Sequence, residues 1–176
     1  MQIVVTVMGE DRPDLIVELT RIVKDAKCNI LESRITELGR EFAAHLLIEG
    51  NWNHIVRLES LLEASAQRLT LKLATMRCRD EEEPPPEDVI PYSVDVFAAE
   101  QPDTIHDLAE FFTARNIKIL DLNTSRYPAP YGGAQVFIAH MIVKIPTGMK
   151  IVSLRDEFLE FCDQINIDAI LEPVKR

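Results

Sequence analysis

Apolar residues in the first half of the chain follow two different spacings. A continuous apolar and β-branched run over 2–8 predicts a central strand covered on both faces. After a loop, a stripe at helical spacing predicts an amphipathic helix whose first position is Pro13. The pattern then predicts strands over 29–38 and 41–49, a helix capped by Asn53, and a closing strand over 69–77.

The second half of the chain repeats these landmarks in the same order. Pro13-Asp14-Leu15-Ile16 returns as Pro102-Asp103-Thr104-Ile105, and Ile30-Leu31-Glu32 returns as Ile119-Leu120-Asp121 at the same offset. Phe42-Ala43-Ala44-His45 returns as Phe137-Ile138-Ala139-His140 after an extra segment that begins at Tyr127. A shared order of landmarks with one loop insertion indicates a duplication, in which each copy is a small domain.

The order strand, helix, strand, strand, helix, strand is that of the ferredoxin-like sandwich, a four-stranded antiparallel sheet with two helices on one face. The chain is therefore predicted to be an α+β protein with domains over 1–79 and 92–176. The acidic, proline-rich segment 80–91 is predicted to be an extended linker. The other face of each sheet is bare and partly apolar, so we expect it to pack against the other copy or another chain.

Composition and charge exclude several classes of protein. The formal net charge of −10 lacks the basic face that a nucleic-acid binder needs, so direct DNA or RNA binding is not expected. No apolar run approaches the roughly 20 residues that span a membrane, and no export signal is present, so a cytoplasmic protein is expected. Cys28, Cys78 and Cys162 form no Cys-x-x-Cys pair, which predicts reduced thiols and neither a disulfide framework nor a metal site.

Two histidines occupy matching places on the bare faces of the two predicted sheets. Packing of the copies could bring His45 and His140 together as ligands, as a pH-sensitive contact or as a substrate handle. The alternative is that duplication copied a histidine that hydrogen-bonds across an interface. An enzyme would need both in a shared cleft, and the sequence carries no other catalytic pattern, so no catalytic residue is assigned.

The first strand-to-helix loop is the second candidate site. A helix N-terminus offers unpaired N–H groups that suit a carboxylate, and Asp11 could pair with an ammonium group. These are the two ends of a free amino acid. The alternative is a capped loop in which Asp11 or Asp14 satisfies the helix start by itself.

The motif Asp11-Arg12-Pro13-x-Leu15-Ile16, followed by a helix and Cys28-Asn29-Ile30, resembles the signature of the ACT domain. That family of ferredoxin-like modules binds amino acids and regulates metabolic enzymes and transcription. Further runs between residues 28 and 60 resemble a subgroup of tandem ACT proteins that repress transcription. The resemblance implies a ligand pocket with Asn29 and Ile30 as its opposite wall and the loop as its centre: Asp11, Arg12, Pro13, Asp14 and Leu15. In it, Asp11 would bind the ammonium group, and the N–H groups near Asp14 and Leu15 would bind the carboxylate.

The resemblance also implies a non-enzymatic regulator without a cofactor. Its effector would be glycine or a similar small amino acid, and a protein partner such as a transcriptional activator would contact DNA in its place. A homodimer is expected. One departure concerns Asp14 and Asp103, which stand where ACT loops usually carry glycine, because an Asp there repels a ligand carboxylate. The second loop also has Glu100-Gln101 in place of the Asp-Arg pair. Either the ligand differs, or it binds between copies, or the chain is an interaction module with vestigial pockets.

Overall fold

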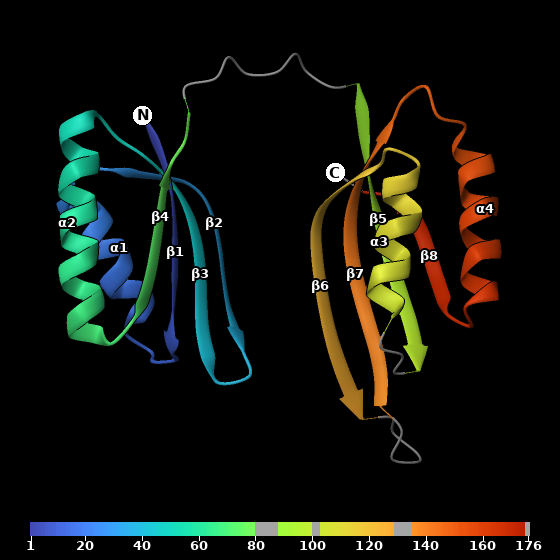
Figure 1. Cartoon of the computed structure of the whole chain (residues 1–176), viewed down its shortest axis with the longest axis horizontal. Coiled ribbons are helices and arrows are strands. Elements are labelled where there is room, and N and C mark those ends of the chain that lie inside the picture. The colour runs from blue at the N-terminus through green and yellow to red at the C-terminus, as the bar shows by residue number, and fades with distance from the viewer. Residues whose placement is uncertain (80–87, 100–102, 129–134, 175–176) are drawn as a thin grey trace. The chain divides into compact units, whose positions relative to one another are not determined.

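The structure, a computed structural model, describes residues 1–79, 88–99, 103–128 and 135–174 (Figure 1). The chain divides into two compact units, Met1–Glu83 and Pro84–Arg176, which are the first and second domains. Most of the predicted linker over 80–91 lies outside the described residues, so the domain bounds stay a prediction. Its far end differs from the prediction: Val89 and Ile90 already belong to a strand, because they pair with the apolar end of a neighbouring strand.

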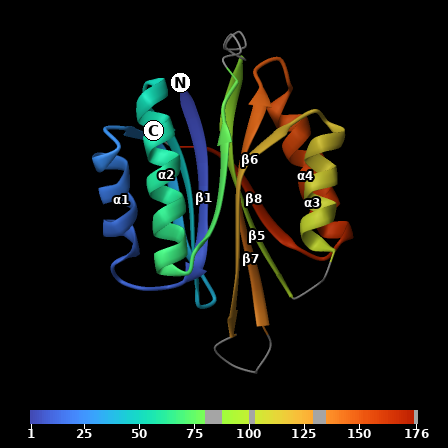
Figure 2. The ribbon, with the colours of Figure 1, turned by 60° about the vertical axis from the view of Figure 1, so that its left-hand side comes forward.

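The first domain is a four-stranded antiparallel sheet in the order β2-β3-β1-β4. Both helices lie on the same side of this sheet (Figure 2). Along the chain, its elements are β1 (Gln2–Glu10), α1 (Leu15–Asp25), β2 (Asn29–Leu38), β3 (Glu41–Glu49), α2 (Trp52–Leu69) and β4 (Lys72–Arg77).

The second domain repeats this architecture, with a sheet in the order β6-β7-β5-β8 and both helices on one side (Figure 2). Its elements are β5 (Val89–Ala99), α3 (Thr104–Ala114), β6 (Lys118–Pro128), β7 (Gln135–Pro146), α4 (Ile151–Gln164) and β8 (Asp168–Pro173). The predicted α+β protein of two ferredoxin-like βαββαβ domains is confirmed.

The repeated motif Ile30-Leu31-Glu32 has a structural cause. Pairing of β2 with β3 shifts register between Ile30 and Glu32, and pairing of β6 with β7 shifts between Ile119 and Asp121. Each motif is therefore a β-bulge near the start of the second strand of its domain, where one extra residue bends the strand. Duplication has kept this bulge in both copies.

Burial alternates along the central strand of each sheet. Ile3, Val5 and Val7 of β1 are buried against the helices, whereas Val4 and Thr6 are only partly covered. The prediction that β1 is covered on both faces is therefore wrong within the domain. An antiparallel sheet with helices on one side buries every second residue of its strands. The residues that alternate with the buried ones face the open side, and those that are β-branched there favour the strand conformation.

The ends of the helices differ from the predictions by a few residues. Pro13 lies in a turn, and α1 begins at Leu15. Helix α2 is capped by Asn51 rather than by Asn53, because the Asn51 side chain accepts the N–H of His54 at 2.9 Å. Helix α2 also runs further than predicted, to Leu69, so β4 is correspondingly shorter than the predicted closing strand.

A left-handed residue follows each of the four helices in the described part of the chain. These residues have φ between 55° and 59° and are Lys27, Thr70, Asn116 and Asn166. They occupy matching places in the two domains, after the first helix and after the second. The turn that leads from helix to strand is thus the same four times.

The packing around Gly50 is tight. A Cβ added at Gly50 would lie 2.8 Å from Cys28 Sγ, 3.2 Å from His54 Cβ and 3.4 Å from Ile55 Cδ1. Cys28 and Ile55 both belong to the buried core. Gly50 follows β3 and approaches α2 and the residue before β2 so closely that this position requires glycine.

We expect Gly50→Ala to destabilise the first domain by about 1–3 kcal/mol, the usual range for overpacking. The single tryptophan of the chain, Trp52, starts α2 two residues later, so its fluorescence reports on this domain. Urea unfolding followed by tryptophan fluorescence should show a lower midpoint. Asn53→Ala is the control, since Asn53 is an exposed residue of α2 in the same domain. Equal midpoints for the two variants would contradict the tight packing.

The cysteines differ in exposure and in acidity. Cys28 and Cys162 are buried, and Cys78 at the end of β4 is partly exposed. Burial raises the pKa of the Cys28 thiol, and burial with the nearby Asp163 charge raises the pKa of the Cys162 thiol to about 12. Because the thiolate is the reactive form, both buried thiols are poorly reactive at neutral pH.

In the folded, reduced protein at pH 8, an aromatic disulfide reagent should label Cys78 within minutes and leave Cys28 and Cys162 unlabelled. All three thiols should react at once in denaturant. Peptide mapping after alkylation identifies the labelled residue. Fast labelling of Cys162 without denaturant would contradict the burial that the structure gives it.

Candidate functional site

The loop between β1 and α1, Asp11–Asp14, is held between two turns at one end of the first sheet. Asp11 donates its N–H to the carbonyl of Arg40, in the turn between β2 and β3, at 3.2 Å. Gly9, on β1, lies against the turn before β4, where an added Cβ would be 2.5 Å from Leu71 Cδ2. The loop therefore has a fixed position relative to the sheet.

An ion pair within the loop engages Asp14. A guanidinium nitrogen of Arg12 lies 3.2 Å from Asp14 Oδ2, and the two side chains are 39% and 57% exposed. Asp14 is the N-cap residue of α1, yet its side chain makes no capping hydrogen bond. The alternative of a loop capped by Asp14 is therefore wrong, because this carboxylate contacts Arg12 and does not bond the helix start.

The first N–H groups of α1 are partly free. Leu15 donates its N–H to the carbonyl of Arg12 at 3.2 Å, so this group is not available to a ligand, contrary to prediction. Among the described residues, the N–H groups of Ile16 and Val17 have no hydrogen-bond partner. These groups stand at the positive end of the helix dipole and suit an anion. Leu15 itself is fully buried and anchors the helix to the core.

Asn29 and Ile30 lie at the other end of the sheet from the loop. Asn29 pairs with Glu49 of β3, and Glu49 in turn pairs with Gln2 of β1. The loop follows Glu10, eight residues further along β1, which separates the two places by about 26 Å at about 3.3 Å per residue. Within one domain, Asn29 and Ile30 therefore do not form the opposite wall of the loop, and this prediction is corrected.

The residue that sequence reasoning missed beside the loop is Arg40. Pairing of the predicted strands over 29–38 and 41–49 places the turn between them at the same end as the end of β1. That antiparallel geometry was the available signal, because it follows from the strand order alone.

The equivalent loop of the second domain is described only from Asp103 onward, so Glu100 and Gln101 lie outside the described residues. Asp103 is the N-cap residue of α3 and, like Asp14, makes no capping hydrogen bond. The next residue, Thr104, is buried, in the place that Leu15 holds in the first domain.

His45 and His140 occupy equivalent places on the open faces of their sheets. Nδ1 of His45 lies 3.1 Å from Thr6 Oγ1, and Nδ1 of His140 lies 2.6 Å from Asp95 Oδ1. Thr6 and Asp95 are themselves equivalent positions of β1 and β5. Each histidine thus has a hydrogen-bond partner in its own domain, which favours a structural role, while the predicted approach of the two histidines stays a prediction.

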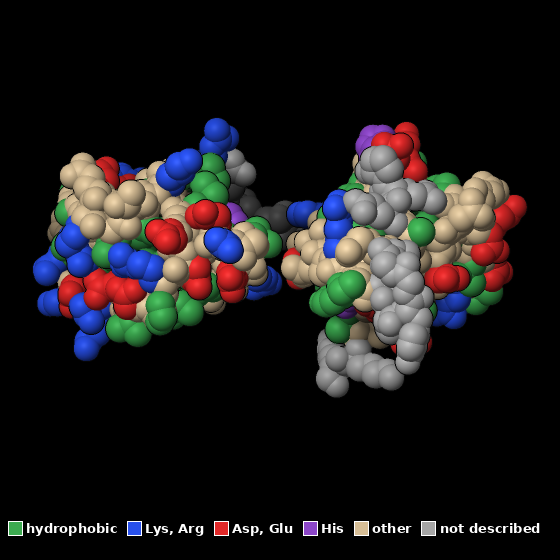
Figure 3. Space-filling view, turned by 90° about the horizontal axis from the view of Figure 1, so that it is seen from below, with side chains coloured by type: hydrophobic (Ala, Val, Ile, Leu, Met, Phe, Trp, Pro, Cys, Tyr) green, Lys and Arg blue, Asp and Glu red, His purple; other side chains and the backbone are tan. Residues whose placement is uncertain are grey.

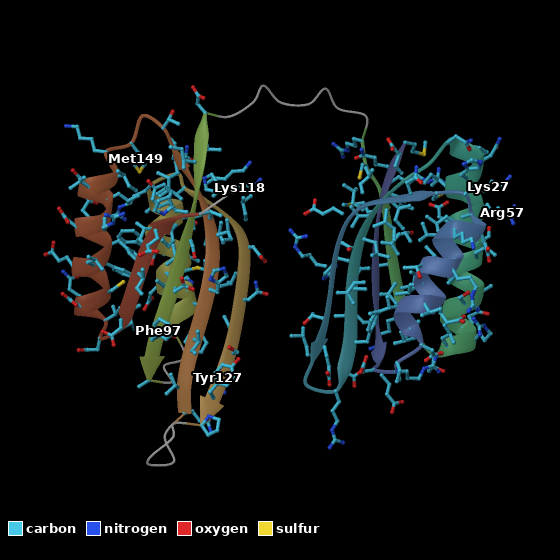
Figure 4. The ribbon with its side chains drawn as sticks, turned by 180° about the vertical axis from the view of Figure 1, so that it is seen from behind. Lys27, Arg57, Phe97, Lys118, Tyr127 and Met149 are labelled. Carbon is cyan, nitrogen blue, oxygen red and sulfur yellow. The ribbon has the colours of Figure 1, made fainter. Side chains whose placement is uncertain are left out.

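The open face of the second sheet also carries exposed aromatic side chains. Phe97 on β5 and Tyr127 on β6 are 40% and 55% exposed and lie toward the same end of this sheet (Figure 4). On the first domain, Met8 and Met76 are similarly exposed. The expectation that these faces pack against another surface rests on such residues.

The sequence of the first domain matches a known protein family. Residues 1–76 match the family model of the ACT domain. Residues 1–76 form an ACT domain. The fold of the second domain repeats that of the first, which is consistent with the tandem ACT architecture that the resemblance implied.

The chain is also similar, over nearly its whole length, to proteins named glycine cleavage system transcriptional repressor. Those of Escherichia coli strain K12 and Shigella flexneri are each 28% identical over 172 residues, which cover 98% of this chain and 90% of the relative. A crystal structure whose protein is provisionally given the same name has a TM-score of 0.75 and 26% identity, covering 99% of this chain and 98% of the other. The predicted resemblance to the repressor subgroup of tandem ACT proteins is confirmed.

A second solved structure, of an unknown protein from Galdieria sulphuraria, has a TM-score of 0.76 at 22% identity. It covers 99% of this chain and 98% of its own chain, and it supports the fold alone. Among the described residues of the present chain, no helix combines the length and the apolar character that a bilayer crossing requires.

Proposed function

We propose that this chain is a regulatory protein that binds glycine or a similar small amino acid and controls transcription through a protein partner. The observation that supports it best is the β1–α1 loop of the ACT domain, which contains Asp11 and leads into a helix start whose Ile16 and Val17 N–H groups are free among the described residues. A carboxylate and a helix N-terminus are complementary to the ammonium and carboxylate ends of an amino acid. Similarity to the repressor proteins supports the regulatory role.

The Arg12–Asp14 pair bears on how such a ligand is held. Asp14 adds a negative charge close to the helix start, and Arg12 offsets it through their contact of 3.2 Å. A ligand carboxylate at this place would be attracted by the helix dipole and by the Arg12 guanidinium. It would be repelled by the Asp14 carboxylate. This arrangement favours a small ligand that is bound weakly.

Asn29 and Ile30 retain a place in the proposal only if they come from another copy of the domain. β2 is an edge strand, so its residues remain open to a second domain or a second chain. A site completed between copies requires oligomerisation, and we therefore propose a homodimer as the sensing form. We further propose that the protein is cytoplasmic, has no enzyme activity and does not contact DNA itself, in keeping with its net charge of −10.

The second candidate function is an interaction module without a ligand. It is favoured by the exposed apolar residues on the open sheet faces, such as Met8 and Phe97, which suit contacts between chains. The two functions differ in one measurable property, since only a sensor gains stability from a free amino acid.

We expect glycine or serine to raise the melting temperature of the chain followed by tryptophan fluorescence. At about a hundredfold excess over Kd, the stabilisation is about 2.7 kcal/mol, which corresponds to several degrees. Asp11→Ala should abolish the rise, because it removes the partner of the ligand ammonium. Asp25→Ala, at the far end of α1, is the matched control and should keep it. A rise retained by the Asp11 variant would remove that assignment, and silence across all amino acids would favour the interaction module.

Asp14→Ala should tighten binding by about two- to fivefold, because it removes a charge that opposes the helix dipole, worth about 0.3–1 kcal/mol. Titration calorimetry measures the change. Asp103→Ala makes the same replacement in the second domain and should leave affinity unchanged if the first loop is the site. Weaker binding by the Asp14 variant would show that this carboxylate contacts the ligand.

A further inference from the structure

The two helices of the second domain border a hollow of about 660 Å³. Its lining comes from these helices and their C-terminal caps: Asp107, Glu110, Phe111, Ala114, Arg115, Glu157, Glu160, Phe161, Gln164 and Ile165. The rings of Phe111 and Phe161 lie 4.9 Å apart between centroids and form an apolar floor. We call this hollow the α3–α4 groove.

The rim of the α3–α4 groove is acidic. Arg115 is its one cation, and it is already engaged: its guanidinium lies 3.7 Å above the Phe111 ring and donates to Glu157 at 3.1 and 3.2 Å. Asp107, Glu110 and Glu160 have no ion-pair partner among the described residues. In the view of Figure 3, Asp and Glu side chains lie along the outer edge of the second domain with few Lys or Arg side chains among them.

The first domain fills the equivalent place with its own cations. Glu18 lies 2.7 Å from Arg21 and 2.7 Å from Arg68, so it links α1 to α2. The hydrogen bond from Arg68, together with the Arg21 charge, lowers the pKa of the Glu18 carboxyl. The helix pair of the first domain is thus closed by two arginines of the same chain.

Duplication relates these positions to the rim of the groove. At the common offset of the first helices, Glu18 corresponds to Asp107, and Arg21 corresponds to Glu110. Alignment of the second helices at their left-handed residues makes Arg68 correspond to Gln164. The second domain has therefore kept the acidic residue of this cluster, as Asp107. It has lost both arginines, which are replaced by Glu110 and Gln164.

We propose that the α3–α4 groove is the docking surface for a basic amphipathic helix of the protein partner. Lysine or arginine side chains one turn apart on that helix would take the places of Arg21 and Arg68 against Asp107 and Glu110. An apolar residue between them would contact Phe161 and Ile165 on the floor. Docking of an amphipathic helix into a groove between helices is a common mode of recognition. This inference deepens the proposed function, because it supplies the surface through which the chain acts on its partner.

The test uses the full chain and a short fluorescein-labelled peptide of leucine and lysine, with the leucines on one helical face. Fluorescence anisotropy at physiological salt, where the Debye length is about 8 Å, limits long-range attraction to the acidic protein. The variant Glu110→Arg with Gln164→Arg restores the two cations that the first domain carries, so it should fold. It should weaken peptide binding by about tenfold or more through like-charge repulsion.

The matched control is Glu63→Arg with Gln67→Arg on the exposed face of α2, which makes the same replacements and the same change in net charge. It should leave binding within about twofold of the unaltered chain, because exposed charges away from a site act weakly. Equal weakening by both variants, or no binding by the unaltered chain, would overturn the proposal. If spermine displaced the peptide and bound as tightly as the peptide does, the groove would be a site for a small polycation. That result would also overturn the proposal.

The outcome is separable from that of the proposed function. The peptide experiment needs no amino acid, and the melting experiment needs no peptide. A chain that binds glycine but not the peptide keeps its sensing role and loses the groove. A chain that binds the peptide only through Glu110 and Gln164 keeps the groove even if no amino acid stabilises it.

Discussion

The structure of each domain depends on burial of one sheet face beneath two helices. Alternate residues of the central strands supply the sheet's side of the core, as Ile3, Val5 and Val7 do in β1, and the apolar faces of the two helices supply the other side. The same constraint fixes the position of the β1–α1 loop, because α1 must cross back over the sheet as soon as β1 ends. A bulge in the following strand recurs in both domains, at Ile30 and at Ile119. The candidate ligand site is therefore a product of how the helix is attached to the sheet.

Much of this fold could be predicted from sequence, because periodicity and the internal repeat carry it. The predicted strands over 29–38 and 41–49 match β2 and β3, since both are set by turn residues such as Gly39. The site was less predictable. Asn29 belongs to the same sequence motif as Asp11, which suggested that the two residues share one site. Strand pairing instead places Asn29 at the opposite end of the sheet from Asp11. The effect of Asp14 on a ligand carboxylate also depends on the contact between Asp14 and Arg12. The spacing of residues in the sequence does not reveal such a side-chain contact.

The two copies have diverged in charge more than in backbone. The first domain closes its helix pair with Glu18, Arg21 and Arg68, and the second replaces these with acids and an amide above an aromatic floor. The core of the second domain has changed in step, since Phe111, Phe112 and Phe158 pack where the first domain uses aliphatic residues. Duplication thus allows one copy to keep the loop chemistry while the other acquires a different surface.

The left-handed residues after the helices show what duplication has preserved most strictly. The second domain uses asparagine at both places, Asn116 and Asn166, which tolerates this conformation well. The first domain uses Lys27 and Thr70, and a β-branched residue with φ of 56° is held there only by the surrounding structure. The two copies therefore share the direction in which the chain leaves each helix and differ in the residue that turns it. A residue that tolerates the left-handed conformation, such as asparagine, would accordingly add stability at these two positions of the first domain without changing the core.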